Sequence, residues 1–208
     1  MTDLATYHHH RSHTADALAA CSGPRLTSNP ISAATSLVAQ VSHIIRTQRR
    51  PGETKALDYG CGNGTMTDTF AQALDGQALG VDPSLPLIRE ADTTPNAHFL
   101  HAPAGSVPAP SRSFDLVIVS LVLGGLNGAR LGHAVAEIMR VLKRDGLLIL
   151  IEATGERTSN THWTQRSAAQ YQALFPNVGL NQASTFDASA DHLTLLAGRE
   201  GAGAGLRN

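Results

Sequence analysis

Two acidic residues with glycine-rich surroundings stand out in the first half of the chain. Asp58 lies in the short apolar run KALDY, and three alternate glycines follow it at Gly60, Gly62 and Gly64. Asp82 ends the next apolar run, about 20 residues beyond the first glycine, an interval typical of the carboxylate that meets a ribose in nucleotide-binding sheets. Glycine tolerates a positive φ and has no Cβ, so the backbone here can approach a ligand closely. The spacing predicts a site for a small polar ligand.

The elements around this loop alternate between strand-like and helical patterns. Strand-like segments fall at 55–59, 78–82, 98–101, 114–123 and 147–152. Helical patterns fall at 31–49, 65–74, 130–143 and 165–175, with another helix after Ser84. Such alternation indicates a mainly parallel sheet with helices on both faces. Two more segments, at 180–186 and 193–199, predict a C-terminal antiparallel hairpin, so the expected fold is α/β with a doubly wound sheet of seven strands.

Polar side chains stand where four of these strands end. Asp58, Asp82, Ser120 and Glu152 each lie at or near the carboxyl end of a strand-like segment. The carboxyl ends of parallel strands share one edge of the sheet, and ligands of doubly wound sheets bind outside that edge. The topology therefore predicts the same site as the glycine loop.

The composition narrows the classes of partner. The 208 residues are 42% hydrophobic and carry a formal net charge of −1, which gives no electrostatic reason to expect nucleic acid or an anionic membrane and favours a small-molecule substrate. No apolar run approaches the roughly 20 residues that cross a bilayer. The start MTDLATYHHHR lacks the pattern of a secretory signal. We therefore expect a cytoplasmic protein in which Cys21 and Cys61 are both free thiols.

The chain is expected to have three parts. These are an N-terminal helical cap or lid segment over 1–50, a ligand-binding core over 51–199 and a flexible tail over 200–208. In the first part, His9 and His13 are spaced to share a helix face and could bind a metal, but no acidic or cysteine partner accompanies them. We expect a solvated or pocket-lining helix there and no metal site.

Four segments of the chain together resemble a known family. The segments LDYGCGNGTMT, LGVDPS, SFDLVIVSLVL and EIMRVLKRDGLLILIEA resemble four successive motifs of the class I S-adenosylmethionine-dependent methyltransferases, in the same order and spacing, over about 55–153. The branch that they resemble most acts on small molecules. The resemblance implies a Rossmann-like sheet that ends in an antiparallel pair, S-adenosyl-L-methionine as cofactor, and a small-molecule acceptor.

The same resemblance implies roles for individual residues. The residues that would hold the methionine portion of the cofactor are Asp58, Gly60, Cys61 and Gly62. Asp82 would bind both ribose hydroxyls, and Pro83 would lie against the adenine. Ser120 and Leu121 would line the side of the sulfonium.

Two positions depart from the family pattern. Where many relatives have an acid that meets the adenine amino group, this chain has Pro103, so adenine recognition is expected to rest on backbone groups around Ala104. Where many relatives have one or two histidines, this chain has Gly124 and Gly125. A base commonly expected at that position is therefore absent.

Any proton acceptor must come from elsewhere in the chain. The candidates are Tyr7 and His10 near the N-terminus and His162 after the fifth strand. Aromatic residues make up only 4% of the chain, which makes Trp163 and Tyr171 candidates for the substrate pocket or for a cation–π contact with the sulfonium.

The expected activity is in-line transfer of a methyl group to a small molecule, whose identity the sequence leaves open. One alternative is a lyase or cyclase that consumes S-adenosylmethionine and releases methylthioadenosine. The other is an accessory protein that binds the cofactor without turnover. A dinucleotide site is disfavoured, because the nicotinamide fingerprint has two residues before its last glycine whereas this loop has one.

Overall fold

The computed structural model describes residues 30–103, 106–154, 163–188 and 191–202, without the side chains of 30–36, 187, 188 and 191. The strands are β1 (Lys55–Tyr59), β2 (Gln77–Asp82), β3 (Ala97–His101), β4 (Phe114–Ser120), β5 (Leu142–Ala153), β6 (Asn181–Ala188) and β7 (Asp191–Arg199). The helices are α2 (Pro30–Gln48), α3 (Thr67–Leu74), α4 (Leu85–Glu90), α5 (Gly128–Val141) and α6 (Ala168–Leu174), with a 3-10 turn η1 (Leu123–Gly125).

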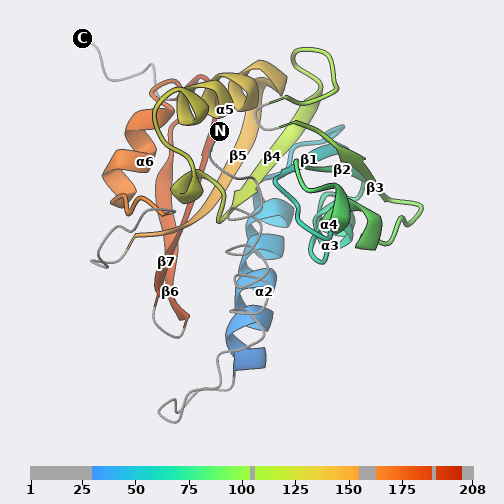
Figure 1. Ribbon diagram of the computed structural model, residues 1–208, viewed down its shortest axis with the longest axis horizontal. Coiled ribbons are helices and arrows are strands. Elements are labelled where there is room, and N and C mark those ends of the chain that lie inside the picture. Colours follow the sequence, from blue (N-terminus) through green and yellow to red (C-terminus); the bar gives the residue numbers. More distant parts are fainter. Residues whose placement is uncertain (1–29, 104–105, 155–162, 189–190, 203–208) are drawn as a thin grey trace.

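The described strands form one seven-stranded sheet in the order β3-β2-β1-β4-β5-β7-β6 (Figure 1). The pairs from β3 to β5 are parallel, whereas β7 runs antiparallel to both β5 and β6. This confirms the predicted Rossmann-like α/β fold with a C-terminal hairpin at one edge. The strand order reverses direction between β1 and β4, and ligands of doubly wound sheets bind outside the carboxyl ends of the strands at such a point.

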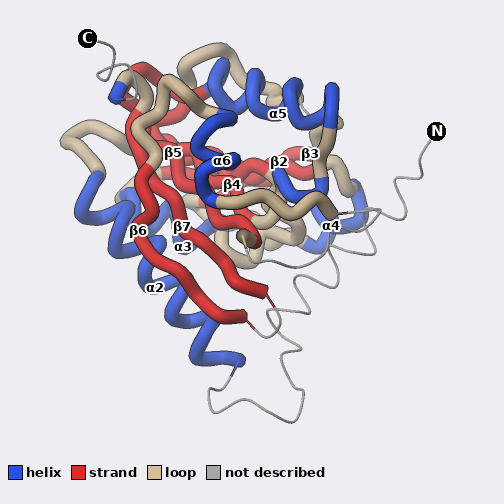
Figure 2. Tube along the Cα trace, turned by 90° about the vertical axis from the view of Figure 1, so that its left-hand side faces the viewer, coloured by secondary structure: helices blue, strands red, loops and turns tan. Residues whose placement is uncertain are grey.

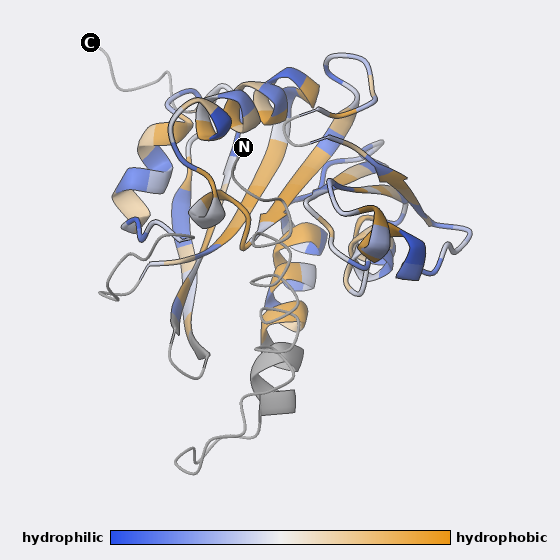
Figure 3. Ribbon diagram, viewed as in Figure 1, coloured by the Kyte–Doolittle hydropathy of each residue, from blue (hydrophilic) through white to orange (hydrophobic). Residues whose placement is uncertain are grey.

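The central strands are apolar on both faces because helices cover both. In β4 every residue from Phe114 to Val119 is buried, and β5 is buried from Gly146 to Ala153. Figure 3 shows both strands as hydrophobic along most of their length. A strand without polar alternation is typical of a parallel sheet between two helical layers.

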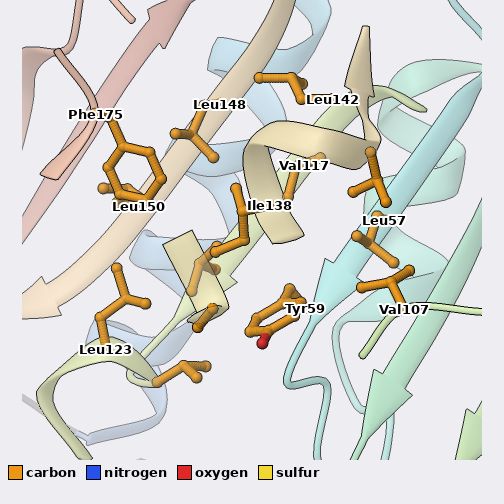
Figure 4. Packing of buried hydrophobic residues seen from close by; sticks show 14 of the residues in the cluster. Leu57, Tyr59, Val107, Val117, Leu123, Ile138, Leu142, Leu148, Leu150 and Phe175 are labelled. Carbon is orange, nitrogen blue, oxygen red and sulfur yellow. The ribbon is translucent and has the colours of Figure 1, made fainter. Parts of the chain in front are cut away.

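Two hydrophobic clusters lie on the two faces of the sheet. One includes Ile138 of α5 and Phe175 after α6, packed on Leu148 and Leu150 of β5 (Figure 4). The other packs α2 and α3 against the sheet, with buried side chains from both helices. Figure 2 shows α5 and α2 on opposite sides of the sheet.

Helix α2 follows its predicted amphipathic pattern. Leu37, Val41 and Ile45 are buried in the same cluster as Phe70 of α3. The described part of the proposed cap is therefore packed on the core. The division of the chain at residue 50 stays a prediction, and residues 1–29 and 203–208 lie outside the described residues.

Several predicted boundaries were wrong. The helix predicted at 130–143 spans Gly128–Val141, and the strand predicted to begin at 147 begins at Leu142. The fourth strand ends at Ser120, since Leu121 has a φ of 53° and turns the chain out of the sheet. Helix α3 begins at Thr67 instead of 65, after the last glycine of the loop. Helix α6 begins after Ser167, whose capping box with Gln170 fixes the first turn, instead of at 165.

Among the described residues, none of the helices combines the length and the apolar character needed to cross a membrane.

Two glycines of the loop allow a matched test of the packing. A Cβ added at Gly64 would lie 2.3 Å from Cε1 of Phe99, whereas one added at Gly62 would meet nothing within 4 Å; both residues have positive φ. We expect Gly62→Ala to lower the free energy of unfolding by about 1–2 kcal/mol from backbone strain alone. Gly64→Ala should lower it by about a further 1–3 kcal/mol from overpacking. Urea denaturation measures both, and equal losses would contradict the packing of Phe99 on the loop.

Candidate active site

The glycine loop is tied to the end of the neighbouring strand. The N–H groups of Gly60 and Cys61 both donate to the carbonyl of Val81, at 2.8 and 3.1 Å. Gly60, Gly62 and Gly64 have φ values of 80°, 62° and 77°, which other residues adopt only with strain. Among the described residues, no atom lies within 4 Å of a Cβ added at Gly62, so this part of the chain leaves room for a ligand beside the loop.

The carboxylate of Asp82 joins this loop to the start of α4. Its Oδ2 accepts a hydrogen bond from the N–H of Gly62 at 3.0 Å, and its Oδ1 accepts one from the N–H of Ser84 at 2.8 Å. The side chain is 1% exposed. Ser84 in turn caps α4 by accepting from the N–H of Leu87, as predicted. Asp82 therefore sets the relative position of two loops at the carboxyl edge of the sheet.

Asp58 plays a similar part at the start of α3. Its Oδ2 accepts a hydrogen bond from the hydroxyl of Thr67 at 2.6 Å, and its side chain is 4% exposed. The carboxylate therefore holds the helix start against the end of β1. Its predicted role toward a methionine group stays a prediction.

Cys61 and Pro83 flank these carboxylates, and both are half-buried. The sulfur of Cys61 lies beside Gly80 of β2, where an added Cβ would come within 2.9 Å of it. The carbonyl of Pro83 accepts a hydrogen bond from Nε2 of His101 at the end of β3, at 3.0 Å. His101 was not predicted as part of the site.

The segment that follows β4, residues 121–126, is called the exit segment below. Ser120 and Leu121, at its start, are half-buried. The N–H of Leu121 donates to the carbonyl of Ile151 at 2.8 Å, which fixes this residue at its φ of 53°. A leucine in the left-handed region is strained, and such strain gathers at functional sites. Because β4 pairs with β1, the exit segment lies next to the end of the strand that carries Asp58.

A buried carboxylate binds the backbone of the exit segment. Glu152 of β5 is 1% exposed, and its Oε1 accepts from the N–H groups of Val122 and Leu123 at 3.0 and 2.8 Å. Its Oε2 accepts from the N–H of Gly124 at 3.2 Å and the hydroxyl of Tyr171 at 3.3 Å. Burial raises the pKa of Glu152 to about 7, although these four donors act in the opposite direction. The sequence showed this acid at a strand end but gave no sign of its partners.

The two predicted substrate-pocket residues, Tyr171 and Trp163, differ in burial. Tyr171 is fully buried on α6, and burial raises the pKa of its hydroxyl. Trp163 is half-buried, and its indole packs on Gly124, where an added Cβ would lie 2.2 Å from the ring. The missing side chain at Gly124 thus makes room for Trp163. Contact of either aromatic residue with a substrate stays a prediction.

Four predicted site residues lie outside the described residues. These are Tyr7, His10, Ala104 and His162. Their predicted roles as proton acceptors or adenine contacts stay predictions. Within the described ranges, no group of three His, Cys, Asp or Glu side chains is arranged to hold a metal ion.

The pKa of Glu152 has a consequence for stability. This pKa of about 7 lies above the ordinary value of 4.5. Between pH 4.5 and pH 7 the folded protein therefore holds a proton on Glu152 that the unfolded chain has lost. The contribution of Glu152 to the free energy of unfolding therefore falls as the pH rises from about 4.5 to about 7. Glu152→Gln removes this titration. Urea denaturation should show that the stability of the wild type relative to this variant decreases across the window, and a constant difference would contradict the raised pKa.

Comparisons with known proteins point to one family. The family model described as a methyltransferase domain matches residues 57–150. The ubiquinone/menaquinone biosynthesis C-methyltransferase UbiE of Campylobacter jejuni is 32% identical over 109 residues, which cover 49% of this chain and 46% of that protein. The chain therefore spans less than half the length of this relative.

Solved structures share the fold. Magnesium protoporphyrin IX methyltransferase ChlM from Synechocystis PCC 6803, solved with bound SAH, has a TM-score of 0.67 at 16% identity and covers 91% of this chain and 95% of its own. The cyclase SpnF has a TM-score of 0.69 at 17% identity over 84% of both chains. Identities this low show the fold alone. The domain match covers the region of the four motifs, and with the similarity to UbiE it supports a methyltransferase domain of the class I S-adenosylmethionine-dependent type over residues 57–150.

Proposed function

We propose that the protein transfers a methyl group from S-adenosyl-L-methionine to a small-molecule acceptor. The observation that carries the proposal is the Asp82 carboxylate at the end of β2, hydrogen-bonded to Gly62 of the glycine loop. A carboxylate accepts hydrogen bonds through two oxygens, so its chemistry suits the two hydroxyls of a ribose.

The remaining cofactor contacts follow from the same edge of the sheet. The loop of Gly60, Cys61 and Gly62 would hold the methionine portion together with Asp58, which fixes the helix behind it. Pro83 would lie against the adenine, with Ala104 as the predicted adenine contact. Ser120 and Leu121, at the neighbouring strand end, would face the sulfonium. A polar loop on one side and a mainly apolar exit segment on the other fit a ligand with a polar end and a reactive cation.

The sulfonium supplies an already electrophilic methyl group, so the chain has mainly to align the acceptor and exclude water. Gly124 and Gly125 provide no side-chain base beside the exit segment. We therefore propose an acceptor that loses its proton easily or beforehand, such as a thiol, an amine or an activated ring carbon. The name of the Campylobacter relative, a quinone C-methyltransferase, supports the last of these.

A cytoplasmic location is part of the proposal, since the thiol of Cys61 inside the ligand loop suits a reducing compartment. The acceptor is a small molecule because the near-neutral net charge of −1 supplies no general attraction for nucleic acid.

One incubation separates methyl transfer from the alternatives. The purified protein with S-adenosylmethionine and a panel of thiols, amines and hydroxylated quinones should form S-adenosylhomocysteine only when an acceptor is present. Release of methylthioadenosine without any acceptor would instead establish lyase or cyclase chemistry, and tight cofactor binding with no product from any acceptor would favour an accessory role.

Substitution of Asp82 tests the cofactor site. Asp82→Ala removes the acceptor for two ribose hydroxyls, and hydrogen bonds to a charged group contribute about 1.5–3 kcal/mol each. We expect the Kd for S-adenosylhomocysteine to rise at least about 100-fold in calorimetry. The matched control is Asp75→Asn, at an acid whose side chain is 82% exposed after α3, which should leave the Kd unchanged. Asp82→Asn keeps the shape of the side chain, so an unaltered affinity in a folded Asp82→Asn protein would refute the ribose assignment.

A further inference from the structure

We propose that Glu152 and Arg166 are positioning residues that hold the exit segment from its two sides and thereby dock Trp163 on Gly124 as a wall of the acceptor site. We call the contacts of Glu152 and Arg166 with the exit segment the clamp. These contacts belong to the fold, and only the role of Trp163 as a wall of the acceptor site rests on the proposed function.

Glu152 binds the backbone N–H groups of the exit segment. Three consecutive N–H groups, from Val122 to Gly124, point at one buried carboxylate. A buried polar group needs its partners, so the carboxylate and the turn η1 stabilise each other. The contact therefore selects the shape of the segment.

Arg166 binds backbone carbonyls of the exit segment. Its two terminal nitrogens donate to the carbonyls of Leu123 and Leu126, at 2.8 and 2.7 Å. One of them also reaches the carbonyl of Thr164 at 3.5 Å. The planar guanidinium spans two carbonyls that lie three residues apart, which the single ammonium of a lysine cannot reproduce.

Tyr171 links the two halves of the clamp. Its hydroxyl donates to Oε2 of Glu152 at 3.3 Å, and the positive charge of Arg166 acts to lower the pKa of the same hydroxyl. Ser167, directly after the arginine, caps the helix that carries Tyr171. Tyr171 therefore ties α6 to Glu152, and the exit segment is bound by Glu152 on its N–H side and by Arg166 on its carbonyl side.

Gly124 is the point where the clamp meets Trp163. Its N–H donates to Glu152, its carbonyl accepts from the N–H of Thr164 at 2.8 Å, and its Cα lies under the indole of Trp163. A shift of the exit segment therefore has to move Trp163. Since Leu121, at the other end of the segment, is predicted to face the sulfonium, the clamp would set the distance between methyl donor and acceptor wall.

The chain supplies a matched control for the clamp. Arg140 of α5 donates to the carbonyls of Val107 and Ala109 and pairs with Glu137, which accepts from the N–H of Val107. The chemistry is the same as at Arg166, but it holds the loop before β4. Arg140→Lys should therefore cost stability without altering the surroundings of Trp163.

The fluorescence of Trp163 tests the clamp directly, because it is the only tryptophan in the chain. In the ligand-free protein, Arg166→Lys and Glu152→Gln should each shift the emission to longer wavelength and raise the acrylamide quenching constant about twofold, as the indole leaves Gly124. Arg140→Lys should match the wild type in both. An unchanged emission in both clamp variants, or an equal change in Arg140→Lys, would overturn the proposal.

Kinetics then test the wall. With an acceptor identified, Arg166→Lys should raise the KM for that acceptor about tenfold, while the Kd for S-adenosylhomocysteine stays within about twofold. If Arg166 were purely structural, Arg166→Lys would change neither the KM for the acceptor nor the Kd for S-adenosylhomocysteine. Equal losses of affinity for the acceptor and for S-adenosylhomocysteine would overturn the role of Trp163 as a wall of the acceptor site. If no acceptor is ever methylated, the proposed function fails while the fluorescence result still decides on the clamp.

Discussion

The Asp82 carboxylate is the contact on which the ligand-binding edge depends. Parallel strands bring β1 and β2 side by side, but the sheet alone does not specify how the loops beyond them are folded. Asp82 does so by accepting the N–H of Gly62 on one oxygen and that of Ser84 on the other. The glycine loop and the start of α4 then keep a fixed separation. A ligand that uses the carboxylate finds both loops already arranged, which lowers the entropy lost on binding.

A second carboxylate repeats the principle on the acceptor side. Glu152 binds backbone N–H groups of the exit segment much as Asp82 binds those of the two loops. The two sites differ in what lies in front of them. Within the described part of the chain, nothing lies within 4 Å of a Cβ added at Gly62, whereas Gly124 is covered by Trp163. The two glycines therefore have different functions. Gly62 leaves space beside the loop for a ligand, and Gly124 leaves space for the side chain of Trp163.

The sequence predicted the parts of the molecule that local patterns encode. The apolar strands, the glycine loop and the position of Asp82 were readable, because strand burial and glycine spacing are properties of neighbouring residues. The hairpin of β6 and β7 was also predicted correctly. Residues 121–123 were read as part of the fourth strand, because Leu121 is apolar and its positive φ leaves no trace in the residue type.

The contacts of the clamp could not be predicted because they join residues far apart in the chain. Arg166 lies at the start of a segment that was read as a helix, and its partners Leu123 and Leu126 use only their backbone carbonyls. The absence of histidine at Gly124 was noticed as a departure, but its physical reason, the indole of Trp163, required the fold. Backbone partners are invisible to any analysis of side-chain types.

The most direct measurement for the central claim is a crystal structure of the protein with S-adenosylhomocysteine. Both ribose hydroxyls should lie within about 2.5–3.0 Å of the Asp82 carboxylate oxygens. The sulfur should lie beside Ser120 and Leu121, with the indole of Trp163 still packed on Gly124. A ligand bound with its ribose away from Asp82, or with its sulfur remote from the exit segment, would contradict the account.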